Sequence, residues 1–131
     1  MRAKSLIPMT VAAVCLSLLS APIFAHHGAA AYDLTRTITS KATVTNLNWA
    51  QPHCILSFDI KSDSGEVTHW SVEMYGPLYL TRSGWKKDTL KPGDEIMITF
   101  NPARNGVHNG IVREGQSKIV LNGQALDLTE H

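Results

Sequence analysis

The sequence predicts an all-β protein: a small closed or partly open barrel of about five to six strands, with one short helix between the third and fourth strands. Three observations lead to this prediction. Apolar and polar residues alternate along most of the chain, clusters of Gly, Pro, Asn, Asp and Ser separate the alternating segments, and a single short segment has both helical start and stop signals. Successive side chains on a strand point to opposite faces, so each alternating segment has one face toward the core.

The first strand begins with Ile38, Ala42 and Val44, which alternate with polar residues. The phase then slips, and Leu47 and Trp49 become the large apolar residues. An extra residue in one strand of a pair shifts the alternation in this way, so we expect a β-bulge within a long first strand.

Two alternating segments, Cys54–Lys61 and Val67–Met74, follow with a turn at residues 62–65 between them. This spacing predicts a hairpin. The register that matches the two apolar faces pairs Phe58 with Trp70. The same register gives three further pairs, namely Leu56 with Val72, Asp59 with His69, and Cys54 with Met74.

A short helix is expected over Pro77–Ser83, because Pro suits the first helical position and Gly84 suits the residue after the end. The turn at residues 91–94 then leads into a fourth strand over residues 95–100.

The C-terminal part predicts one strand from Ile111 to Leu121 that bends around Gly115. Asn122 and Gly123 then form a two-residue hairpin turn into residues 125–128. A bulged strand, a hairpin, a short helix and further strands are the order of an oligonucleotide/oligosaccharide-binding (OB-like) barrel. Another small barrel or a sandwich has the same strand count, and this fold assigns no function by itself.

Residues 1–25 have the features of a secretory signal peptide: Arg2 and Lys4, an apolar segment over residues 6–19, and Ala25 before the cut. The apolar segment is too short to span a bilayer. We therefore expect a single barrel domain over residues 26–131 that is periplasmic or secreted after signal-peptide cleavage.

Charge and chemistry exclude several functions. Removal of the signal peptide leaves a net charge of about −1, so we expect neither nucleic acid nor a membrane as partner. Only Cys54 of the two cysteines then remains, and no internal disulfide can form. His53 and Cys54 are neighbours on a strand and point to opposite faces, so they cannot act on one substrate. The sequence has no Ser or Cys nucleophile elbow, no phosphate-binding Gly loop and no strongly suggestive carboxylate pair. We expect no enzyme activity.

Metal binding is the sharpest chemical hypothesis, and copper is the favoured metal. Cleavage after Ala25 would leave His26 and His27 at the new amino terminus. The free amine can chelate with the ring of His26, or with the intervening peptide nitrogen and the ring of His27. Such nitrogen sets suit Cu(II), and an amine with a pKa of about 8 loses its proton easily.

The other candidate ligands come from the expected hairpin. His53 follows Pro52 at a strand entry, and Glu73 and His69 share the outward face of the next strand. Asp59 is placed to orient His69 as a hydrogen-bond acceptor. The complete set of candidate metal ligands is His26, His27, His53, His69 and Glu73.

Each candidate metal ligand also has an alternative interpretation as an ordinary structural residue. The His-His start is also a flexible polar terminus, His53 a partner for a loop carbonyl, and His69 with Asp59 a surface cross-strand pair. We expect His108 and His131 to be solvated, and Cys54 and Met74 to fill the core rather than to bind Cu(I).

A function of a different class is a binding or assembly module. Aromatic residues on the barrel would then contact a small ligand or a periplasmic partner protein. The candidate residues are Trp49, Tyr75, Tyr79 and Trp85, and their alternative role is packing in the core or at its rim.

Several short motifs resemble a known family of small secreted bacterial proteins, the domain-of-unknown-function family 6152. They are His26-His27, then Trp49 with Pro52-His53, then Gly84-Trp85 with Lys87-Asp88, and finally Leu90-Lys91-Pro92-Gly93-Asp94. The resemblance implies a small periplasmic β domain and supplies no established activity.

Overall fold

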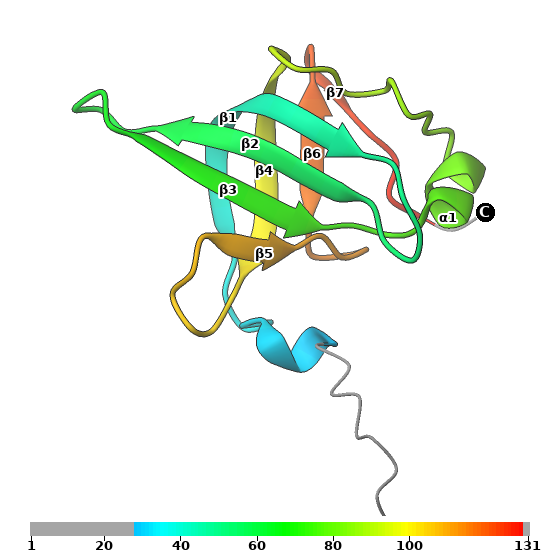
Figure 1. Ribbon diagram of the computed structural model, residues 1–131, viewed down its shortest axis with the longest axis horizontal. Coiled ribbons are helices and arrows are strands. Elements are labelled where there is room, and N and C mark those ends of the chain that lie inside the picture. Colours follow the sequence, from blue (N-terminus) through cyan, green and yellow to red (C-terminus); the bar gives the residue numbers. More distant parts are fainter. Residues whose placement is uncertain (1–27, 130–131) are drawn as a thin grey trace, which may run out of the picture.

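A closed barrel of 5 strands forms the centre of the computed structural model, which describes residues 28–129 (Figure 1). The strand order around the barrel is β1-β2-β3-β5-β4, and a β1–β4 pairing closes it; β6 and β7 extend the sheet beyond β4. The elements are η1 (Ala29–Ala31), β1 (Ile38–Asn48), β2 (Ile55–Lys61), β3 (Val67–Glu73), α1 (Pro77–Arg82), β4 (Glu95–Pro102), β5 (Asn109–Ile111), β6 (Lys118–Leu121) and β7 (Gln124–Ala125).

The predicted all-β barrel with one short helix between the third and fourth strands is confirmed. The predicted bulge lies in β1, where the pairing with β2 shifts register between Val44 and Asn46. The first half of β1 pairs with β4 and the second half with β2. A bulge increases local bend and twist, so this one lets a single long strand close the barrel between two partners.

The β2–β3 hairpin has the predicted register. Phe58 pairs with Trp70, and Asp59 pairs with His69. At the base of the hairpin the Met74 N–H donates to the Cys54 carbonyl at 2.9 Å. Leu56, Phe58 and Val72 of these strands thereby face the barrel interior and are fully buried, while Asp59 and His69 face outward.

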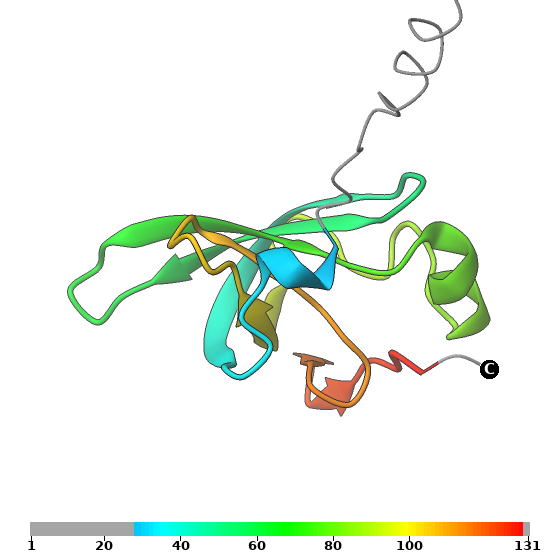
Figure 2. The same ribbon diagram turned by 90° about the horizontal axis from the view of Figure 1, so that it is seen from below.

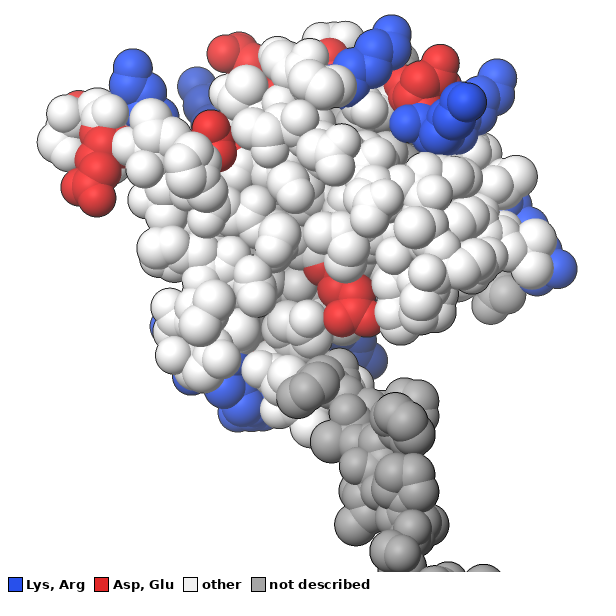
Figure 3. Space-filling view, in the orientation of Figure 1, with Lys and Arg blue, Asp and Glu red and all other residues white. Residues whose placement is uncertain are grey.

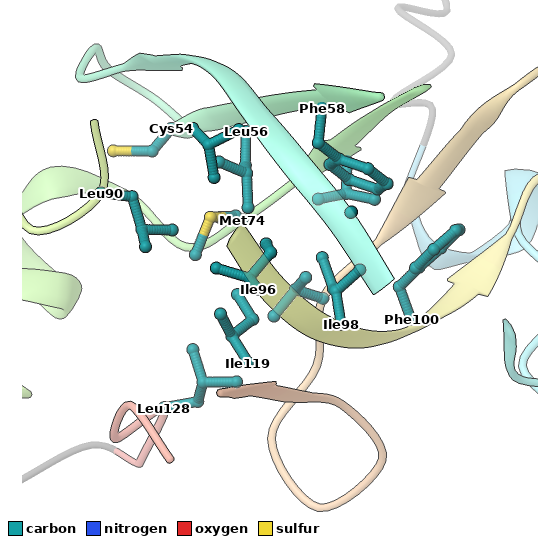
Figure 4. Close-up of a cluster of buried hydrophobic side chains, with 14 of the residues drawn as sticks. Cys54, Leu56, Phe58, Met74, Leu90, Ile96, Ile98, Phe100, Ile119 and Leu128 are labelled. Carbon is teal, nitrogen blue, oxygen red and sulfur yellow. The ribbon is translucent and has the colours of Figure 1, made fainter. Parts of the chain in front are cut away.

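The core fills the barrel with aliphatic and aromatic side chains from every long strand (Figure 4). Phe58 and Phe100 are fully buried and meet edge to face, with ring centroids 5.6 Å apart. Cys54 is also fully buried, and burial raises the pKa of its thiol. Trp70 is only partly buried, and it packs between Phe100 and His108.

The helix α1 lies at one end of the barrel, beside the C-terminal segment (Figures 1 and 2). Pro77 occupies its start, and Gly84 follows its end with a positive φ of 87°. Leu80 of α1 and Trp85, just after the helix, are buried in the core. Among residues 28–129, no helix has the length and apolar character needed to cross a bilayer.

The single bent strand expected from Ile111 to Leu121 is wrong, because the structure divides this segment into β5 and β6. The N–H groups of Gln116 and Ser117 both donate to the Arg113 carbonyl, so a tight turn closes around Gly115. After this turn β6 pairs with β4 on the side of the barrel away from the β2–β3 hairpin (Figure 2). The turn at Asn122 and Gly123 is confirmed, with φ values of 52° and 77°.

Candidate metal-binding site

His53 lies in the loop between β1 and β2, beside the last residue of β3. Its Nδ1 is 2.7 Å from Oε1 of Glu73. A carboxylate accepts hydrogen bonds, so the Nδ1 proton points to Glu73 and the lone pair of Nε2 is left free. The His53 side chain is 51% exposed, compared with 22% for Glu73, so the ring remains open to solvent on its outer side.

Glu73 holds two partners rather than one. Its second carboxylate oxygen, Oε2, accepts a hydrogen bond from the Tyr32 hydroxyl at 3.0 Å. Burial together with the hydrogen bond and the charge of Glu73 raises the pKa of Tyr32 to about 12. Both oxygens of Glu73 are therefore engaged, and its contact with Nδ1 fixes the orientation of the His53 ring.

The loop that carries His53 is packed closely against the start of α1. A Cβ atom placed on Gly76 would lie only 2.5 Å from the carbonyl oxygen of Pro52. The following residue, Cys54, is fixed by an N–H that donates to the Tyr75 carbonyl at 3.1 Å. His53 therefore stands between two anchored residues, and its backbone position is well defined.

Tyr32 belongs to an N-terminal segment that is attached to the barrel. It forms a β-bridge with Ala103, and the Asp33 N–H donates to the Pro102 carbonyl at 2.8 Å. Arg104 adds two contacts through its backbone N–H and its Nε, which donate to the carbonyls of Ala31 and Ala30. The beginning of the described chain thus runs beside the His53–Glu73 pair.

His69 forms a second pair with Asp59 and lies apart from the first. Its Nδ1 is 2.5 Å from Oδ1 of Asp59, and its side chain is 84% exposed. His69 and Glu73 share the outward face of β3 as expected, but four residues at about 3.3 Å each put them about 13 Å apart. Within residues 28–129, no group of three or more His, Cys, Asp or Glu side chains could hold a metal ion.

The two remaining candidate ligands, His26 and His27, lie outside the described residues, as does His131. His108 is exposed, as expected, and it also has a ring contact. Its ring lies against Trp70, with centroids 4.8 Å apart and an interplanar angle of 34°. The Trp70 indole is only partly buried by the barrel, so it offers a surface on which the His108 ring packs.

The four candidate aromatic residues are engaged within the fold. Trp85 is 2% exposed, and its Nε1 donates to the Asp127 carbonyl at 2.6 Å. Tyr75 and Tyr79 stack on each other with centroids 4.0 Å apart, while Trp49 is partly buried against the core. The Tyr75 hydroxyl accepts from the Glu114 N–H, so these rings hold the C-terminal segments to the barrel. The described part of the structure has two shallow surface hollows, and none of these four aromatic residues lines either of them.

Tyr32 is the member of the site that the sequence does not reveal. It is 41 positions from Glu73, and no periodicity or motif connects the two. The nearest signal is the position of an aromatic residue just before the first predicted strand, which does not specify where its hydroxyl goes.

No curated protein is similar enough to the chain to count as a match. The model of one family, described as a "Family of unknown function (DUF6152)", matches residues 13–114, which is most of the 131 residues and includes the barrel strands β1 to β5. The chain belongs to the DUF6152 family of unknown function.

Proposed function

We propose that this protein is exported to the periplasm or secreted, and that its mature form binds Cu(II) rather than acting as an enzyme. The amine and imidazole of His26, together with His27, supply nitrogen ligands, and Nε2 of His53 completes the site. Nitrogen donors in a planar set are the environment that Cu(II) prefers, and Cu(II) binds most tightly in the divalent series.

The observation that carries the proposal is the hydrogen-bonded chain Tyr32–Glu73–His53. Glu73 fixes the His53 ring with Nε2 outward, which is how metal-binding histidines are commonly held. Tyr32 attaches the N-terminal segment to the same carboxylate. His26 lies only six positions before Tyr32 and is separated from it mainly by the short helix η1, and this nearness in sequence supports an amine close to His53.

Binding by the folded protein must be separated from the affinity that any His-His peptide has for copper. We expect the exported protein to bind Cu(II) at least about tenfold more tightly than a short peptide starting at His26, which corresponds to about 1.4 kcal/mol. A competitive titration at one pH compares the two. Equal affinities would show that the barrel contributes nothing, and the proposal would fail.

The matched variants are His53→Ala and His69→Ala. Both histidines are exposed and paired with a carboxylate, but only His53 lies beside Tyr32 and Glu73. His53→Ala should lower the affinity about tenfold and His69→Ala should leave it unchanged. Equal losses in the two variants would show nonspecific imidazole binding.

The start of the mature chain is tested by mass spectrometry of the exported protein. The proposal requires a chain that begins at His26, because a start at Ala29 or later removes the amine and both leading histidines. Adding one residue before His26 should also weaken binding, since it displaces the amine from the first chelate ring.

A further inference from the structure

The outer face of the barrel carries a row of small hydroxyl and amide side chains across four neighbouring strands. Ser57 of β2 pairs with Ser71 of β3, and Ser71 pairs with Asn109 of β5. Thr45 extends the row onto β1, at the bulge beside Asn46, which pairs with Ser57. Neighbouring strands lie about 4.8 Å apart, so the row presents polar groups at a regular spacing on a rigid sheet.

This row forms the floor of a shallow hollow on the surface. The side chains of Asp59 and His69 border it along β2 and β3, and Val107 and His108 border it from the loop before β5. In the view of Figure 3, the surface over the middle of β2, β3 and β5 is mainly free of charged side chains. Asp59 is the one charged side chain among the lining residues, and no Lys or Arg lines the hollow.

The polar groups of the hollow are partly preorganised and partly free. The Ser71 hydroxyl donates to Oδ1 of Asn109 at 2.9 Å, which leaves the Asn109 amide protons available. Asp59 holds Nδ1 of His69, so Nε2 of that ring is left for another contact. Among residues 28–129 the hydroxyls of Thr45 and Ser57 make no hydrogen bond that the structure shows, and both groups can donate and accept.

One side of the hollow is aromatic and apolar. The exposed His108 ring is held against Trp70, and Val107 beside it is 52% exposed. A ligand in the hollow would therefore meet hydroxyl, amide and carboxylate groups on the floor and a ring surface at the side. Sites that combine a few placed polar groups with aromatic walls bind small molecules that have both polar edges and apolar faces.

We propose that this hollow binds a neutral carbohydrate. Sugar rings present hydroxyl groups at their edges and C–H groups on their faces, which match the row of hydroxyl and amide groups and the His108 ring. A phosphorylated or carboxylated ligand fits less well, because Asp59 is the only charge and is negative. This site is separate from the proposed copper site, since it uses none of His26, His27, His53 or Glu73.

The test is a titration of the exported protein with three neutral trisaccharides, maltotriose, cellotriose and chitotriose. Chemical-shift changes of the backbone amides in NMR spectra report binding. At least one of the trisaccharides should bind with a dissociation constant of about 1 mM or lower and shift the amides of Ser57, Ser71 and Asn109. No shift at these amides with any of the three, at concentrations of about 10 mM, would overturn the proposal.

Variants identify the site. Asn109→Ala with Ser71→Ala removes the hydrogen-bonded pair and should weaken binding at least about threefold. If the double variant unfolds, Asn109→Ala alone serves, because its side chain is exposed. The control is Thr39→Ala, which removes one hydroxyl of the exposed Thr39–Thr99 pair between β1 and β4 and should not change the affinity. Equal weakening by the control would also overturn the proposal.

Discussion

His53 and Glu73 are joined by a 2.7 Å contact between Nδ1 and Oε1, which links the β1–β2 loop to the last residue of β3. The same carboxylate accepts from the hydroxyl of Tyr32. One acidic side chain therefore connects the N-terminal segment, a loop and a barrel strand. Changes to Glu73 should affect both the stability of this corner of the molecule and the orientation of the His53 ring.

The first prediction concerns that orientation. Glu73→Gln removes the negative charge that holds the Nδ1 proton of His53, and we expect Cu(II) affinity to fall about tenfold, as when the partners of metal-binding histidines are changed. Competitive titration measures the loss. Asp59→Asn is the matched control, because Asp59 makes the same contact with His69 outside the proposed site. Unchanged affinity in Glu73→Gln would contradict an orienting role for this residue.

The hairpin register could be predicted from the sequence, whereas the proximity of the candidate ligands could not. Alternation fixes which residues face outward, and the pairing of Asp59 with His69 follows from matching two apolar faces. The alternation correctly predicted that His69 and Glu73 lie on one face of β3. A shared face is not a shared site, however, because four residues separate the two along the strand.

The division of the C-terminal segment into β5 and β6 could not be predicted from the sequence, because it depends on pairing with strands that are distant in sequence. β5 has only three residues, and it pairs in parallel with β3 and antiparallel with β4. Such a short element has too few residues for a clear alternation, and its partners are far away in sequence. The same is true of Tyr32, whose contact with Glu73 is set by the bridge to Ala103.

The second prediction uses pH. The pKa of Tyr32 is raised from its ordinary 10.0 to about 12, so the folded protein retains the phenol proton where the unfolded chain loses it. The stability contributed by Tyr32 is fully present below pH 10.0 and decreases as the pH rises toward about 12. Denaturant unfolding should show that the wild-type protein loses stability over this range more steeply than Tyr32→Phe.

At neutral pH, Tyr32→Phe should lower the free energy of unfolding by about 1 kcal/mol, the usual contribution of one hydrogen bond. The other two tyrosines are present in both proteins, so the difference between the two pH profiles isolates Tyr32. Parallel profiles between pH 10.0 and about 12 would show that the Tyr32 hydroxyl does not depend on Glu73.

The third prediction concerns the core. Phe58→Ala removes a fully buried ring that contacts Phe100 and should cost about 3 to 5 kcal/mol. Trp70→Ala should cost about 3 kcal/mol, at the lower end of that range, because Trp70 is only partly buried. Denaturant midpoints of the two variants provide the measurement. An unchanged midpoint for Trp70→Ala would mean that its contacts with Phe100 and His108 do not stabilise the fold.

The fourth prediction tests the support of the His53 loop. In Gly76→Ala the new Cβ would lie 2.5 Å from the Pro52 carbonyl oxygen, so either this loop or the start of α1 must move. Overpacking of this kind costs about 1 to 3 kcal/mol. If the loop moves, His53 leaves its position beside Glu73, and Cu(II) affinity falls together with stability. The clash is with the backbone of Pro52, so it tests the position of the loop and not the side chain of Pro52. Wild-type stability and wild-type copper affinity in Gly76→Ala would show that the loop yields freely and that its packing against Gly76 does not position His53.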